Sequence, residues 1–213
     1  MKKIFSLALL TVFFVSCQKE PDLSDMDGEF TVLTNFDVNA DMSTASTFYI
    51  PDSILLIGSD SENPTYWTGT NASNLVSEFV SNMEEFGYTR STDKADADLG
   101  LQVSYIENDH YFADFFTPSW WWGYPGYWDP FYWGIGWGGW YNPIPVVYQY
   151  RTGSMIVEMV DLRKSSEELE DHRLPILWTA YMTGLLSGYN RFDEALTIDA
   201  INQAFSQTEG LKK

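Results

Sequence analysis

The chain has 213 residues, with 12 basic and 30 acidic side chains and a formal net charge of −18 at neutral pH. This excess of acids excludes electrostatic attraction to nucleic acid phosphates or to an anionic membrane surface, so no nucleic acid partner is expected. Length and composition predict one acidic globular domain, in which aromatic residues are frequent at 17%.

The first residues have the pattern of an export signal. A basic head, Lys2 and Lys3, is followed by the apolar run Ile4–Val15 and then by Ser16 and Cys17. The run is too short to span a membrane, which takes about 20 residues. Together with the basic head and the small residue at its end, it predicts a signal peptide over residues 1–16.

Cys17 is the only cysteine in the chain. With the three residues before it, it resembles a bacterial lipobox, with Phe14 at the position where Leu is usual. In such signals the preceding peptide is removed and the cysteine becomes the acylated N-terminus, which several buried acyl chains hold firmly in the membrane. We therefore expect Cys17 to be lipidated; the alternative is an ordinary secretory signal with an incidental cysteine.

An acidic tether, residues 17–29, follows the signal. Its start, Gln18–Asp22, looks like the tag that sends lipoproteins to the cell surface in one Gram-negative phylum, although Pro21 interrupts the acids. Loss of residues 1–16 removes two lysines and no acid, which moves the formal charge from −18 to −20. The expected location is the outer membrane, with the lipid anchor on either its periplasmic or its surface side.

Residues 30–210 are expected to form a single domain. Strands are predicted at Phe30–Phe36 and at Thr47–Ile50, because both segments are rich in β-branched and aromatic residues. A helix is predicted at Asn71–Phe86, where apolar residues recur at helical spacing, with Ser73 as its N-terminal cap and Gly87 at its end.

Two groups of acids resemble metal sites without completing one. Asp37, Asn39 and Asp41 have the spacing of an EF-hand loop, but Met42 replaces the required glycine and Phe48 the bidentate glutamate. Three more aspartates at 93, 96 and 98 have no histidine near them. A turn is therefore predicted at the first group, a solvated turn at the second, and a metal site at neither.

The second half of the domain is predicted to hold the remaining strands and a final helix. Asp98–Ile106 alternates between apolar and mostly polar residues, which predicts a half-buried strand. Further strands are expected at 146–150, 154–162 and 175–181, with a bulge or bend at 152–153, and a helix at 193–207. The predicted fold class is α+β, a two-layer sandwich. Its largely antiparallel sheet has about four to six strands, with two helices on one face.

An aromatic insert is expected at about residues 107–143. Its densest part, Trp120–Tyr141, holds seven of the nine tryptophans, and Asp129 is its only charged residue. These rings could extend the core, recognise a sugar or a protein partner, or sit at the membrane interface. The tentative ligand- or partner-binding residues are Trp120, Trp121, Trp122, Trp128, Trp133, Trp137 and Trp140. The other two tryptophans, Trp67 and Trp178, are expected in the core.

No catalytic constellation is recognised in the sequence. The two histidines, His110 and His172, have no partner at a telling spacing, and no nucleophile elbow, zinc-protease motif or Walker loop occurs. Gly134–Gly139 satisfies G-x-G-x-x-G, but that motif needs a preceding strand and a following helix, and here tryptophans surround it. We expect no enzyme activity and no cofactor.

The order of several short motifs resembles an uncharacterised family of small bacterial envelope lipoproteins, a domain of unknown function with a Gly- and aromatic-rich insert. The resemblance covers roughly residues 30–207, with Thr179-Ala180 where Arg-Gly usually follows the late Trp. It implies a two-layer α/β fold, similar to lipoprotein subunits that assist outer-membrane assembly, and no known activity. The motifs are Asp37 to Asp41 before Phe48-Tyr49, Phe86-Gly87-Tyr88 leading to Ala97-Asp98-Leu99, Thr152–Val157 running into Val160-Asp161, and Leu177–Ala180.

Two functions are therefore expected as alternatives. The first is a lipid-anchored, non-enzymatic outer-membrane domain of structural, assembly or interaction type, which engages another envelope protein. The second is a surface protein that binds a glycan or another hydrophobic-faced ligand through its tryptophan-rich insert.

Overall fold

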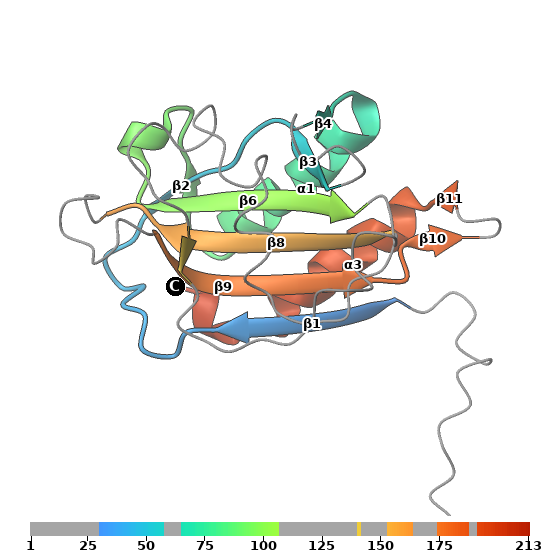
Figure 1. The fold of residues 1–213 in the computed structure, drawn as a ribbon. Helices are drawn as coiled ribbons and strands as arrows, with labels where there is room; N and C mark the ends of the chain where they lie inside the picture. The colour runs from blue at the N-terminus through green and yellow to red at the C-terminus, as the bar shows by residue number, and fades with distance from the viewer. Residues whose placement is uncertain (1–29, 58–64, 107–139, 142–152, 164–173, 188–190) are drawn as a thin grey trace, which may run out of the picture.

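The fold is described from a computed structural model of the chain (Figure 1). The structure describes residues 30–57, 65–106, 140–141, 153–163, 174–187 and 191–213. The helical elements are α1 (Thr70–Glu85), η2 (Lys94–Asp96), α3 (Glu194–Ser206) and η6 (Glu209–Leu211). The strands are β1 (Thr31–Phe36), β2 (Thr47–Tyr49), β3 (Ile54–Ile57), β4 (Thr65–Trp67), β5 (Thr89–Arg90), β6 (Leu99–Ile106), β7 (Trp140–Tyr141), β8 (Ser154–Asp161), β9 (Leu174–Thr183), β10 (Leu186–Ser187) and β11 (Arg191–Phe192).

The centre of the molecule is a mixed sheet whose long strands are antiparallel. Its main order is β1-β9-β8-β6-β2-β5, and β3, β4 and β7 join it at the sides. β1 with β9, β9 with β8 and β8 with β6 pair antiparallel, whereas β2 and β3 both run parallel to β6. The predicted α+β class is confirmed. The sheet has nine strands rather than about four to six, because short segments, among them β3 and β4, also pair in it.

Both long helices cover the same face of this sheet (Figure 1). The predicted apolar stripe of α1 is buried and packs on the sheet and on α3. Asp193 caps α3 by accepting a hydrogen bond from the backbone of Leu196 at 3.1 Å. The predicted capping role of Ser73 is wrong: Gly69 occupies the N-cap of α1, and Ser73 already donates its backbone N–H to the carbonyl of Gly69.

The second face of the sheet is buried as well. All eight residues of β6 and all eight of β8 are buried, so the prediction of a half-buried strand at 98–106 is wrong. On this face the strand register places Gln102, Glu158 and Thr179 side by side, all at most 3% exposed. Period-2 alternation identified the two faces of the strand correctly, but it cannot show that a polar face is covered.

Trp178 lies in the core as predicted, with no exposed surface, and its indole N–H donates to the hydroxyl of Thr208 at 3.1 Å. Trp67 is half-buried and packs against the core beside Tyr105 and Phe192, with ring centroids 5.4 and 4.7 Å away. None of the helices in the described ranges is long and apolar enough to cross a membrane.

Candidate functional site

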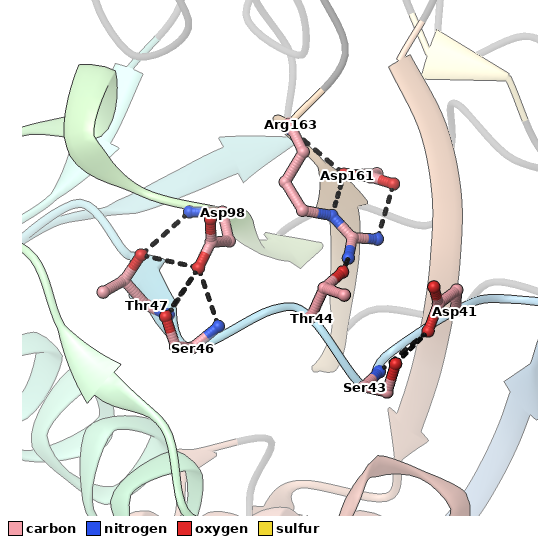
Figure 2. A network of polar contacts seen from close by, with 8 residues as sticks. All are labelled: Asp41, Ser43, Thr44, Ser46, Thr47, Asp98, Asp161 and Arg163. Carbon is pink, nitrogen blue, oxygen red and sulfur yellow. Dashed lines mark hydrogen bonds and ion pairs between the residues drawn. The ribbon is translucent and has the colours of Figure 1, made fainter.

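A cleft of about 440 Å³ lies where the loop between β1 and β2 passes the ends of β8 and β9. The loop forms one wall of the cleft. Asp161 at the end of β8 and Arg163 just after it form the second, and the start of β9 forms a third, apolar wall. Figure 2 shows the polar contacts on either side of the loop. The lining residues are Asp37, Asn39, Ala40, Asp41, Thr44, Asp161, Arg163, Pro175 and Leu177.

Two aspartates shape the loop by binding their own backbone. Asp37 Oδ1 accepts hydrogen bonds from the backbone N–H and the side-chain amide of Asn39, at 2.9 and 3.2 Å. Asp41 Oδ1 accepts from the backbone N–H and the hydroxyl of Ser43, at 3.0 and 2.6 Å. Such bonds from aspartate to the residue two positions on stabilise turns. The turn predicted at this acidic group is confirmed.

The opposite wall is a bidentate ion pair between Asp161 and Arg163. Nε and one terminal nitrogen of Arg163 donate to the two carboxylate oxygens of Asp161, both at 2.8 Å. The other terminal nitrogen donates to the hydroxyl of Thr44 at 2.7 Å and so joins this wall to the loop. Asp161 is only 5% exposed, so its charge is removed from water and needs this partner. The bond to Asp161 raises the pKa of Arg163 above its usual value, although burial opposes the shift.

The loop is fixed at its far end by Asp98. One oxygen of this carboxylate accepts from the backbone N–H groups of Ser46 and Thr47, at 2.7 and 2.9 Å, and lies 3.0 and 3.1 Å from their hydroxyls. Burial alone raises the pKa of Asp98, but these hydrogen bonds together outweigh it and lower the pKa below its ordinary value. The prediction that Asp98 lies in a solvated turn is wrong. Of the three neighbouring aspartates, Asp93 and Asp96 are exposed, and Asp93 caps η2.

This arrangement is suited to holding a ligand rather than to moving a proton. Hydrogen bonds from the hydroxyl and then the backbone of Ser43 lower the pKa of Asp41, so this acid stays ionised near neutral pH, as Asp98 does. Three carboxylates and one guanidinium charge line the cleft. Within the part of the chain that the structure describes, no three potential metal ligands come close enough to hold an ion.

The structure does not test the site residues that were predicted from the sequence. Cys17 and the tryptophans Trp120, Trp121, Trp122, Trp128, Trp133 and Trp137 lie outside the described residues. Of Trp140 only the backbone is described: it begins β7 and pairs in parallel with Leu174.

Sequence reasoning missed Arg163 and the role of Asp98. A signal for Arg163 was present, because residues two apart in an extended chain point the same way and Arg163 directly follows the strand predicted to end at Leu162. The partners of Asp98 had no such signal. They are 51 and 52 residues away and become neighbours only because β2 pairs with β6 in the register that joins Phe48 to Leu99.

Comparison with known proteins places this fold in a family. The sequence model for DUF4136, a domain of unknown function, matches residues 32–207. The crystal structure of a DUF4136 family protein from Bacteroides thetaiotaomicron is 47% identical, and the match covers 86% of this chain and 97% of that one with a TM-score of 0.76. The PelC dodecamer of Paraburkholderia phytofirmans matches over 84% of this chain and 96% of that one. Its identity of 15% and TM-score of 0.39 support no argument about this chain. No curated protein sequence matches.

Proposed function

The chain belongs to the DUF4136 family, and from that premise we propose that it is a lipid-anchored, non-enzymatic domain of the outer membrane that binds another component of the cell envelope. The anchor is Cys17, at the end of the export signal. Through it the domain is held at the membrane by acyl chains rather than by charge, which suits a chain with a net charge of −18. The cleft beside Arg163 is the surface that engages the envelope component.

The observation that supports binding is the lasting charge of two groups that line the cleft, Asp41 and Arg163. A general acid or base works best when its pKa lies near the operating pH. Here the pKa of Asp41 is lowered and that of Arg163 is raised, so both stay charged across the physiological range. Groups of this kind orient and hold a ligand but do not exchange protons with it. The rigid fork between Asp161 and Arg163 adds a preorganised donor set, which lowers the entropy lost on binding.

The alternative, a glycan- or hydrophobic-ligand-binding protein that uses the tryptophans of the insert, stays a prediction. It shares the anchor with the first proposal and differs in the surface used. The two are separated by finding where on the domain a partner makes contact.

Anchoring is tested by growing cells with an alkyne-bearing palmitate and fractionating their membranes. We expect the wild-type chain to carry the label and to sediment with outer membrane, and Cys17→Ser to lose both properties. Ser73→Ala, on the exposed surface of α1, is the matched control and should keep both. An unlabelled wild-type chain, or a labelled Cys17→Ser chain, would show that the anchor is wrong.

Binding at the cleft is tested by placing a photo-crosslinking amino acid at Asn39, an exposed residue of the loop, in living cells. A crosslinker at Ser73 serves as control. This residue lies in the first turn of α1. In Figure 1 α1 begins toward the opposite end of the sheet from the end of β8. A discrete adduct is expected from Asn39, and none from Ser73. Equal adducts at both positions, or none at Asn39, would contradict a binding role for the cleft, and an adduct obtained only from Trp128 or Trp133 would favour the insert.

A further inference from the structure

We propose that the cleft between the β1–β2 loop and the Asp161–Arg163 pair binds a neutral polyhydroxylated ligand, namely one sugar residue of an envelope glycan. This inference rests on the proposed function, because it names the kind of envelope component that the same cleft binds. It departs from the sequence-based alternative, in which a glycan stacks on the tryptophans of the insert.

The cleft presents acceptors and donors to the same space. Asp37 and Asp41 each use Oδ1 in a turn, and among the described residues Oδ2 of both is left to accept a hydroxyl proton. A guanidinium has five N–H groups, and three of those on Arg163 are used toward Asp161 and Thr44. The other two have no partner within the described ranges. Hydroxyls on adjacent carbons both donate and accept, so a polyol can satisfy both walls at once.

The third wall is apolar. Pro175 and Leu177, at the start of β9, line the cleft beside the charged residues. A pyranose ring has one edge of hydroxyls and faces made largely of C–H groups, so it can direct its hydroxyls to the loop and a C–H face to this wall. Binding sites commonly combine apolar walls with a few placed polar groups, and a volume of about 440 Å³ lies in the usual range for a small ligand.

The charges that line the cleft favour an uncharged ligand of this class. Three carboxylates outnumber the one guanidinium in the lining, and Arg163 is already paired with Asp161. A uronate or a phosphate would be repelled by Asp37 and Asp41 and would have to compete with Asp161 for the guanidinium. An amine would be attracted by the carboxylates but repelled by Arg163. A protonated amine also has no acceptor for the free N–H groups of Arg163. A neutral polyol meets both signs without a penalty.

The test compares ligands that differ only in charge on one ring. The full protein, purified from the producing cells, is titrated with methyl glucoside, methyl galactoside and methyl mannoside. The corresponding methyl uronides and 2-amino sugars are titrated in parallel, and binding is followed by ligand-observed NMR and calorimetry. We expect saturable binding of at least one neutral glycoside and at least tenfold weaker binding of its uronide. The proposal is overturned if a uronide or a 2-amino sugar binds as tightly as its neutral glycoside, or if no ligand of any series binds saturably.

The site of binding is tested with Asp37→Asn and Asp41→Asn combined. An asparagine oxygen can still accept the turn hydrogen bonds, so the loop should keep its shape while the charged acceptors are lost. We expect affinity for the neutral glycoside to fall at least tenfold, with thermal unfolding changed by no more than a few degrees, and Ser73→Ala to leave affinity unchanged. Unchanged affinity in the double variant overturns the assignment. If a crosslink forms at Asn39 but no sugar binds, the proposed function stands and this inference falls. If sugars bind but Cys17 carries no lipid, the anchored function falls instead.

Discussion

Removal of the Asp98 carboxylate should destabilise the domain and release the loop that builds the cleft. Asp98→Ala deletes the single oxygen that accepts from two backbone N–H groups at 2.7 and 2.9 Å and lies within 3.1 Å of two hydroxyls. A hydrogen bond to a charged group contributes about 1.5–3 kcal/mol, and water can replace part of it here because Asp98 is only half-buried. We therefore expect Asp98→Ala to lower the free energy of unfolding by about 2–4 kcal/mol, mainly through the two backbone donors.

Asp98→Asn removes the charge of this side chain but keeps an acceptor oxygen. The asparagine oxygen can take the position of the carboxylate oxygen, and neutral hydrogen bonds are roughly half as strong as charge-assisted ones. The expected loss is therefore about half of that in Asp98→Ala. The matched control is Asp96→Ala, two residues earlier, which removes the same charge from an exposed side chain.

The assay is urea unfolding at neutral pH, followed by the fluorescence of the tryptophans. A change of about 2–4 kcal/mol in a domain of this size corresponds to a shift in Tm of roughly 4–16 °C. If Asp98→Ala unfolds within about 0.5 kcal/mol of the wild type, the range of ordinary surface substitutions, or no lower than Asp96→Ala, the four contacts do not hold the loop and the reasoning is refuted.

The same residue predicts a pH dependence. Its pKa is lower in the folded protein than the ordinary value of about 3.9. The unfolded chain therefore binds the proton first as pH falls, so the contribution of Asp98 is fully present above that value and is lost as pH falls through the folded pKa. The difference in stability between wild type and Asp98→Asn should be constant from pH 5 to 7 and shrink below pH 4.

Two further predictions concern the core. Gly153 has φ +73°, and an added Cβ would lie 2.3 Å from Cγ of Leu186, whereas at Gly69, φ +98°, it would meet nothing within 4 Å. Gly153→Ala should therefore lose about 2–4 kcal/mol by chemical unfolding and Gly69→Ala only about 1 kcal/mol; equal losses would show that Leu186 moves aside. Thr208→Val leaves the buried indole N–H of Trp178 without its acceptor and should cost about 1–3 kcal/mol. An unchanged free energy of unfolding would mean that another acceptor replaces Thr208.

Several features followed from the sequence because they are local. The period of 3.6 residues identified α1 and α3, since each buries one stripe against the sheet. Alternation identified β6, and β-rich or apolar runs identified β1, β8 and β9. The turn at Asp37 to Asn39 was predictable for the same reason, because its hydrogen bonds join residues two apart. The α+β class followed from the order of these elements.

The cleft and the buried polar face were decided only by tertiary structure. Asp98 reaches Thr47 because β2 pairs in parallel with β6 in one register, and no local pattern specifies which distant strands pair. Thr44 reaches Arg163 across 119 residues for the same reason. Gln102 and Glu158 alternate as solvent-facing residues do, yet both are buried, because alternation reports which face a side chain is on and burial depends on what the folded chain places over that face.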